Sequence, residues 1–147
     1  GVVALSGLLF IVSFIVAGLN FRYHWHTLPT ILPYIASIIF LIGYAMYAEV
    51  MRENAWLSRT IEVQENQSVV STGLYGIVRH PMYMATVLMY LTMPLVLGSL
   101  IAFGIMLLYI PIIIRRINDE EQLLNAELKG YTEYCTQVRW RLIPYIY

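Results

Sequence analysis

Long uncharged blocks alternate with polar segments along this chain. The uncharged blocks are residues 1–19, 28–48 and 82–114. A membrane-crossing helix needs about 20 mostly apolar residues to span roughly 30 Å of hydrocarbon, so the first two blocks each predict one crossing. As a single helix, the third block would be about 50 Å long at about 1.5 Å per residue, which is too long for one crossing. We therefore predict two antiparallel helices there, separated at Pro94 and Gly98.

The composition also favours a bilayer. Hydrophobic residues make up 59% of the chain and charged residues 12%, and the mean hydropathy is +0.67, whereas soluble domains average about 25% charged residues. The predicted fold class is all-α, a polytopic membrane helical bundle with about four transmembrane helices in a single domain. Residues 1–50 supply two of these helices, and residues 51–147 supply the rest. The net charge of zero gives no reason to expect a nucleic acid partner, and a single cysteine excludes an internal disulfide.

The basic residues predict an orientation. Of the nine Lys and Arg residues, all but Arg22 lie in the two polar segments 49–81 and 115–147. Because cytoplasmic flanks of membrane helices are enriched in Lys and Arg, we expect both segments to face the cytoplasm of an integral cell-membrane protein. The chain opens on Gly1, and the first block lacks the basic start of a signal peptide. We therefore expect further helix before it in the full gene product.

The first polar segment leads from the second helix to the third. We expect 49–57 to continue the second helix into water. Residues 60–70 are rich in β-branched side chains and favour a short β-like excursion. The turn-forming residues 71–73 then precede a short helix or loop that carries Tyr75.

The tripeptide Arg79-His80-Pro81 stands directly before the third uncharged block. Proline is favoured at the first position of a helix and pushes its predecessor towards extended geometry, so His80 is predicted to cap a helix that starts at Pro81. At such a helix start, free backbone N–H groups attract negative charge. The alternative is that these residues only begin a membrane helix and that His80 is a solvated interfacial side chain.

The second polar segment predicts a helix that runs to Lys129 and ends at Gly130. Glu121 falls on the same helical stripe as the apolar residues Ile117 and Leu124. A carboxylate on an apolar face near the bilayer is costly unless a cation meets it. Glu121 is therefore a candidate functional carboxylate, with the alternative that it only pairs with Arg79 or another arginine.

Together these pieces resemble the isoprenylcysteine carboxyl methyltransferase family and the related phospholipid methyltransferases. The family pattern is a Gly-Tyr pair, an Arg-His-Pro-x-Tyr motif, a helical hairpin, an Arg-x-x-x-Glu-Glu element, a Tyr-x-x-Tyr pair and an Arg-Leu-x-Pro end. The matching residues are Gly73, Tyr75, Arg79, His80, Pro81, Tyr83, Arg116, Glu120, Glu121, Tyr131, Tyr134, Arg141, Leu142 and Pro144. The resemblance runs from Met51 to the end of the chain, and 1–50 is matched only as hydrophobic helix.

The resemblance implies a membrane-embedded methyltransferase that uses S-adenosyl-L-methionine (SAM). No Gly-x-Gly-x-x-Gly sequence is present, so other residues would hold the nucleotide. The implied cofactor-binding residues are Tyr75, Arg79, His80, Pro81, Tyr83, Glu120, Glu121, Tyr131 and Tyr134. The implied catalytic residues are His80, Glu121 and Arg141, and no metal is expected.

The chemistry of these residues suits such a cofactor. A carboxylate, Glu120 or Glu121, can hold its amino group, while His80 and Arg79 can meet its carboxylate or hydroxyl groups through charge-assisted hydrogen bonds. Tyrosine rings can pack on adenine or face the sulfonium. Methyl transfer then requires mainly alignment of donor and acceptor and exclusion of water.

The acceptor is expected to be a lipophilic, isoprenoid or lipid-linked molecule that enters from the bilayer among membrane lipids. Arg139 or Arg141 is a candidate for orienting an anionic group on it. Two alternatives remain open: a lipid- or solute-binding or transport protein without chemistry, and a nicotinamide-dependent reductase, because membrane sterol reductases look similar in their C-terminal half. The sequence does not indicate the identity of the acceptor or the oligomeric state.

Overall fold

The computed structural model describes residues 1–25, 27–58 and 61–147, and these residues contain helices and no strand. The helices are α1 (Val2–Tyr23), α2 (Ile31–Glu53), the short 3₁₀ helix η1 (Gly73–Gly76), α3 (Pro81–Val96), α4 (Leu100–Met106), α5 (Tyr109–Glu127) and α6 (Tyr131–Gln137). The all-α prediction is thus confirmed. The β-like excursion was wrong for its described part, 61–70, where the chain runs without a partner strand.

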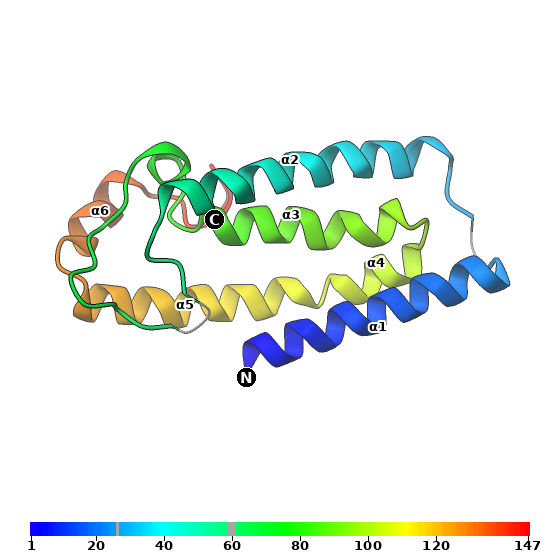
Figure 1. The fold of residues 1–147 in the computed structure, drawn as a ribbon, viewed down its shortest axis with the longest axis horizontal. Helices are drawn as coiled ribbons and strands as arrows, with labels where there is room; N and C mark the ends of the chain where they lie inside the picture. Colours follow the sequence, from blue (N-terminus) through cyan, green and yellow to red (C-terminus); the bar gives the residue numbers. More distant parts are fainter. Residues whose placement is uncertain (26, 59–60) are drawn as a thin grey trace.

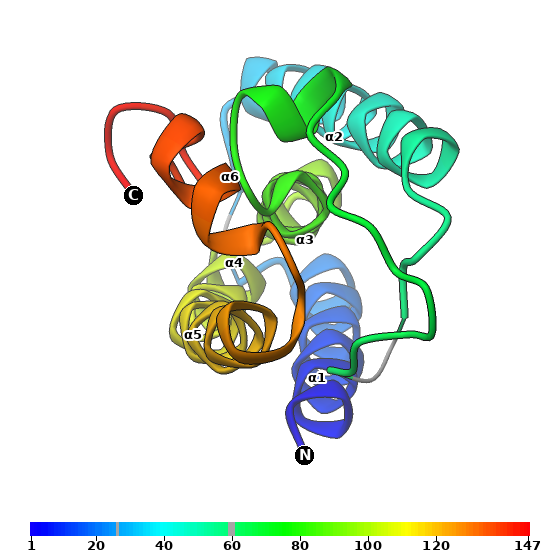
Figure 2. The same ribbon diagram turned by 90° about the vertical axis from the view of Figure 1, so that its left-hand side faces the viewer.

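Three helical stretches in the described part of the chain are long and apolar enough to cross a membrane. They are α1, α2 and the continuous stretch Leu100–Glu127 formed by α4 and α5. The fourth expected crossing, α3, is apolar but has only 16 residues, or about 24 Å at about 1.5 Å per residue. These helices run side by side along the long axis of the molecule (Figures 1 and 2).

The predicted helical hairpin is present, with its break one turn later than proline alone would place it. Pro94 lies inside α3, and the chain turns at 97–99, where Gly98 adopts φ 75°. Glycine takes this left-handed conformation without steric cost. Ser99 then caps α4, because its hydroxyl accepts a hydrogen bond from the Ala102 backbone N–H at 3.2 Å.

Close backbone contact holds the bundle together. α2 packs along α3, and a Cβ at Gly43 would lie only 3.0 Å from Met89 and 3.2 Å from the Ala85 carbonyl oxygen. α1 packs against α4, where Ser13 donates to the Ala102 carbonyl oxygen at 3.3 Å. Small residues at a helix interface let two helix backbones approach closely. In lipid this close packing matters, because burial of apolar side chains does not by itself drive helices together.

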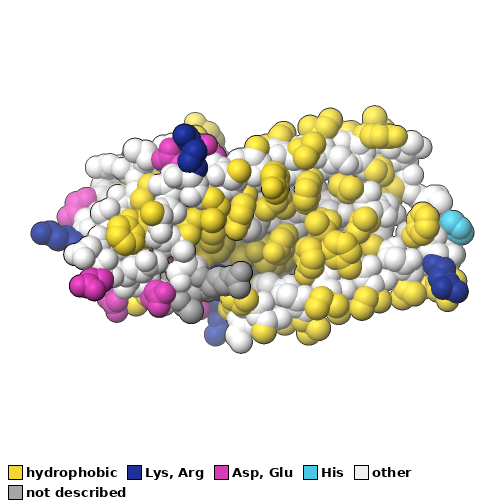
Figure 3. Space-filling view, in the orientation of Figure 1, with side chains coloured by type: hydrophobic (Ala, Val, Ile, Leu, Met, Phe, Trp, Pro, Cys, Tyr) yellow, Lys and Arg dark blue, Asp and Glu magenta, His cyan; other side chains and the backbone are white. Residues whose placement is uncertain are grey.

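The two polar segments meet at one end of the bundle, where most of the charged side chains in view gather (Figures 1 and 3). Two predicted helix ends there were wrong. α2 ends at Glu53, four residues before the predicted end, and α5 ends at Glu127. Gly130, expected to stop that helix, instead precedes α6 with φ 85°.

Candidate active site

Local proline chemistry places His80 as predicted. His80 is the N-cap residue of α3, and Pro81 is its first residue. The tail of the chain fixes this cap, because the Arg79 N–H donates to the Trp140 carbonyl oxygen at 2.9 Å and the His80 N–H donates to that of Arg141 at 2.8 Å. Residues 79–80 and 140–141 therefore lie against each other although they are far apart in sequence.

This pairing builds a buried ion cluster around Glu121, which is 5% exposed. Arg79 Nε donates to Glu121 Oε1 at 2.7 Å and its Nη2 to Oε2 at 3.2 Å, a two-pronged contact. His80 Nε2 lies 3.1 Å from Oε1, and Arg141 Nε lies 2.9 Å from Oε2. Basic side chains of the protein thus contact both oxygens of the Glu121 carboxylate. Pairing of Glu121 with Arg79 or another arginine was the alternative to a functional role for this carboxylate.

The neighbouring Glu120 has a different environment. The Tyr83 hydroxyl donates to Glu120 Oε2 at 2.5 Å and accepts from Arg116 Nε at 2.7 Å. Tyr83 therefore connects this carboxylate to a buried arginine. Adjacent residues on an α-helix point about 100° apart, so Glu120 and Glu121 face different surroundings.

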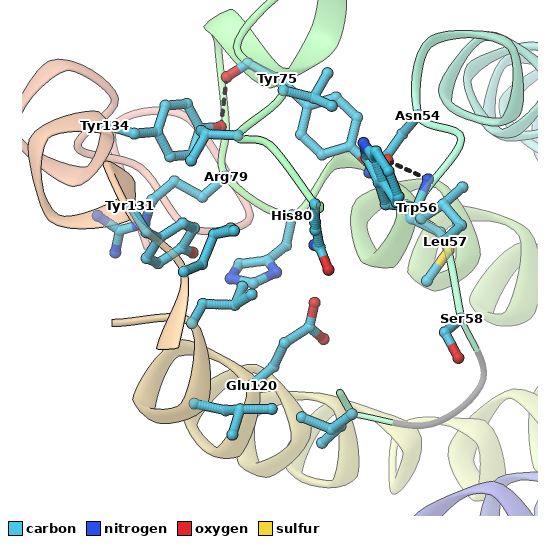
Figure 4. A pocket seen from close by; sticks show the side chains of 18 of the residues that line it. Asn54, Trp56, Leu57, Ser58, Tyr75, Arg79, His80, Glu120, Tyr131 and Tyr134 are labelled. Atoms are coloured by element: carbon cyan, nitrogen blue, oxygen red, sulfur yellow. Dashed lines mark hydrogen bonds between the residues drawn. The ribbon is translucent and has the colours of Figure 1, made fainter. Parts of the chain in front are cut away.

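Glu120 projects from α5 into a pocket, which we call the polar pocket (Figure 4). The polar pocket is lined by Asn54, Trp56, Leu57, Ser58, Ile61, Glu62, Gln67, Ser68, Val69, Val70, Tyr75, Arg79, His80, Met82, Tyr83, Glu120, Leu123, Leu124, Leu128, Tyr131 and Tyr134. The empty space among these residues is about 820 Å³ when the open solvent at the mouth is included.

Besides Tyr83, the polar pocket is lined by Tyr75, Tyr131 and Tyr134, which are buried but differ in their hydroxyl partners. Tyr134 donates to the Tyr75 carbonyl oxygen at 2.6 Å, and the Tyr75 hydroxyl accepts from Asn54 Nδ2 at 2.8 Å. The Tyr131 hydroxyl is buried and has no hydrogen-bond partner among the described residues. Burial raises the pKa of all three phenols above the ordinary value, so each is protonated at neutral pH.

A second space, the apolar cavity, adjoins the polar pocket at the level of the membrane helices. It is lined by Val2, Val3, Ser6, Gly7, Tyr47, Met51, Leu57, Ser58, Met82, Tyr83, Thr86, Tyr90, Tyr109, Ile113 and Arg116, and its empty space out to the mouth is about 1230 Å³. Leu57, Ser58, Met82 and Tyr83 line both spaces. Figure 3 faces the hollow, apolar surface between α2 and α1.

The comparison with protein families decides the class of this site. Residues 34–126 match the isoprenylcysteine carboxyl methyltransferase (ICMT) family. The chain belongs to this family. The ICMT match begins upstream of Met51, where the motif resemblance starts, and it contains Arg79, His80, Glu120 and Glu121. Family membership supports a membrane methyltransferase, and the tail motif from Tyr131 onward lies beyond the match.

One curated relative belongs to a different enzyme class. The Delta(14)-sterol reductase of Mus musculus is 32% identical over 91 residues, which are 60% of this chain and 22% of the reductase. The chain thus spans only about a fifth of the reductase's own length.

The structure brings most of the predicted ICMT site residues to the polar pocket. Tyr75, Arg79, His80, Tyr83, Glu120, Tyr131 and Tyr134 line it. Three predicted residues lie elsewhere. Glu121 is enclosed by its basic partners, Pro81 is buried at the start of α3, and Arg141 contacts Asn118 Oδ1 at 2.9 Å on the far side of Glu121. Arg139 is exposed. Neither Arg139 nor Arg141 borders the polar pocket or the apolar cavity.

Sequence reasoning missed the loop that forms much of the pocket wall in this ICMT-family chain. Residues from Asn54 to Val70 contribute about half of the described lining, including Trp56 and Gln67. Polar contacts within the loop shape it, because Gln64 Nε2 donates to the Trp56 carbonyl oxygen at 3.0 Å. Thr72 ties its far end to Glu53 with a 2.5 Å hydrogen bond. One signal in the sequence was the aromatic Trp56 within a polar segment.

Proposed function

We propose that this ICMT-family protein transfers the methyl group of SAM to a lipophilic acceptor at the cytoplasmic face of the membrane. The observation that carries the proposal is that the polar pocket and an apolar cavity between membrane helices adjoin at Met82 and Tyr83. A hydrophilic donor and a lipid-like acceptor need two such spaces that meet. Membership of the ICMT family supports the reaction class.

The polar pocket suits SAM in its distribution of charge. Glu120 offers a carboxylate to the cationic sulfonium and ammonium groups. His80 adds its second ring nitrogen, Nδ1, since the contact with Glu121 uses Nε2. Trp56, Leu123 and Leu124 add apolar lining to the pocket, against which an adenosine can pack. When bound, SAM supplies an activated methyl group.

Arg79 and Glu121 act as positioning residues in this proposal. The Arg79 guanidinium is engaged by both Glu121 oxygens and by the Val138 carbonyl oxygen at 3.3 Å. Together these contacts hold the His80 cap and the C-terminal tail in place. Glu120, whose carboxylate borders the pocket, is the member of the Glu pair that meets the cofactor.

The acceptor reaches the site through the apolar cavity. The cavity walls come from α1, α2, α3 and α5, and apart from Arg116 their described residues carry no charge. An apolar chain loses little on leaving the bilayer for such a space. The protein then aligns acceptor and donor and excludes water, which suffices for an acceptor that has no proton to lose.

Calorimetric titration of the detergent-purified protein with SAM tests the proposal. We expect micromolar binding by the wild type, a loss of at least tenfold in Glu120→Gln, and wild-type affinity in the control Asp119→Asn. Asp119 is the matched control because it is exposed on the same helix and does not border the pocket. A folded wild-type protein that binds no SAM would overturn the proposal.

A nicotinamide-dependent reductase is the second candidate, favoured by the similarity to the Delta(14)-sterol reductase. The charges of the pocket oppose it. Its described lining includes the carboxylates Glu62 and Glu120, while Arg79 is already paired with Glu121. The phosphates of a dinucleotide would gain little from this set of charges. Competition of NADPH against bound SAM separates the two functions, and displacement at micromolar NADPH would favour the reductase.

A further inference from the structure

The Tyr131 hydroxyl is the feature of the polar pocket that its own neighbours leave unexplained. Tyr131 is 4% exposed, and its hydroxyl oxygen has no hydrogen-bond partner among the described residues. Buried polar groups are almost always hydrogen-bonded, because an unsatisfied one costs free energy. Tyr134, one turn along the same helix and equally buried, is satisfied by the Tyr75 carbonyl oxygen. The contrast indicates that Tyr131 is oriented for something outside the protein.

The surroundings of this hydroxyl favour a bound molecule as its partner. Tyr131 lines the polar pocket, and Figure 4 shows its hydroxyl on the side of the ring that faces His80 and the pocket. The Cys135 thiol, further along α6, is close enough to interact with it, but a thiol is a weak hydrogen-bond partner. Because Tyr131 lines the polar pocket, a ligand bound there lies beside this ring.

The polar groups near Tyr131 indicate which part of a ligand it meets. Glu120 and His80 line the same pocket, while the Arg79 guanidinium is already paired with the Glu121 carboxylate. Because burial raises its pKa, Tyr131 keeps its proton and can both donate and accept a hydrogen bond. An α-amino acid group supplies both complements, since its carboxylate accepts and its ammonium donates.

We propose that the Tyr131 hydroxyl binds the amino-acid end of the methyl donor and so selects SAM over nucleosides that lack this end. The inference rests on the proposed function, since it assigns one contact within the same site. Tyr134 has no such role, because its hydroxyl holds the loop at Tyr75.

Calorimetry with two ligands tests the assignment in the detergent-purified protein. SAM carries the amino-acid end, and 5′-methylthioadenosine is the same nucleoside without it. We expect Tyr131→Phe to weaken SAM binding about ten- to hundredfold, the effect of one hydrogen bond to a charged group, and to leave methylthioadenosine affinity within about twofold. The matched control Tyr134→Phe changes both affinities by the same factor.

Thermal unfolding without ligand adds a second readout. Removing an unsatisfied buried hydroxyl costs nothing, so Tyr131→Phe is expected to melt at or above the wild-type temperature, whereas Tyr134→Phe melts lower. An unchanged SAM affinity in Tyr131→Phe, or equal losses for the two ligands, would overturn the assignment while leaving the proposed function intact. A wild-type protein that binds neither ligand would overturn both.

Discussion

The most demanding test of the site is the replacement of Glu121 by the isosteric glutamine. Glu121 is 5% exposed and its carboxylate contacts Arg79, His80 and Arg141 at distances between 2.7 and 3.2 Å. Removing one partner of a buried ion pair typically costs about 3–5 kcal/mol, because the remaining charge stays buried and unpaired. Glutamine retains one acceptor oxygen, and the Arg141 side chain is 36% exposed, so we expect the lower end, about 3 kcal/mol.

Thermal unfolding in detergent, followed by the fluorescence of the three tryptophans, measures this effect. A loss of about 3 kcal/mol corresponds to a fall in Tm on the order of 10 °C. The matched variant is Glu120→Gln, which changes the adjacent residue on the same helix. Glu120 borders the pocket, so we expect its Tm to fall by only a few degrees. The reasoning is refuted if Glu121→Gln melts within about 2 °C of the wild type, or if Glu120→Gln is the less stable variant.

Four further outcomes are expected. Gly43→Leu should prevent α2 from packing on α3, because a Cβ alone would already lie 3.0 Å from Met89. We expect this variant to lose its monodisperse peak in size-exclusion chromatography. The control is Gly104→Leu, because a Cβ at Gly104 would meet nothing within 4 Å. Arg141→Met should lower stability by about 1 kcal/mol, less than Glu121→Gln, because Arg141 is only partly buried; an equal or larger fall in Tm would contradict this. Burial raises the pKa of the Cys135 thiol, so its alkylation should be slow at pH 7 and accelerate towards pH 10 as the thiolate forms. A membrane-impermeant maleimide should label Cys135 in inverted vesicles and not in intact cells if the tail is cytoplasmic.

Local chemistry explains which parts of the fold and site were predictable. Uncharged runs long enough for a bilayer predicted the helices, and proline at a helix start predicted His80 as the cap of α3. The clustering of basic residues predicted that the two polar segments share one end of the bundle, as they do (Figure 1). Each of these signals depends on residues within a few positions of one another or on simple charge counting.

The distinction between Glu120 and Glu121 was not predictable, because it depends on a contact between distant segments. The backbone of the tail docks against 79–80 and brings Arg141 to Glu121. No periodicity in the sequence encodes that contact. The prediction of a β-like excursion was wrong for a related reason. The β-branched residues suggested extended pairing, but β propensity reflects packing against a neighbouring strand, and the described residues contain no such strand.

The position of the site at the cytoplasmic ends of the helices, as proposed, reconciles two conflicting needs of the reaction. A hydrophilic donor needs charged contacts, and a lipophilic acceptor needs an apolar wall, yet charges within the bilayer are costly unless paired. The chain pairs these charges internally, Glu121 with Arg79 and Arg141, and Glu120 with Arg116 through the Tyr83 hydroxyl. Tyr83 also borders both spaces, so the side chain that holds the Glu120 carboxylate in the polar pocket is the one that meets the apolar cavity. Under the proposed function, donor and acceptor are both positioned against this side chain.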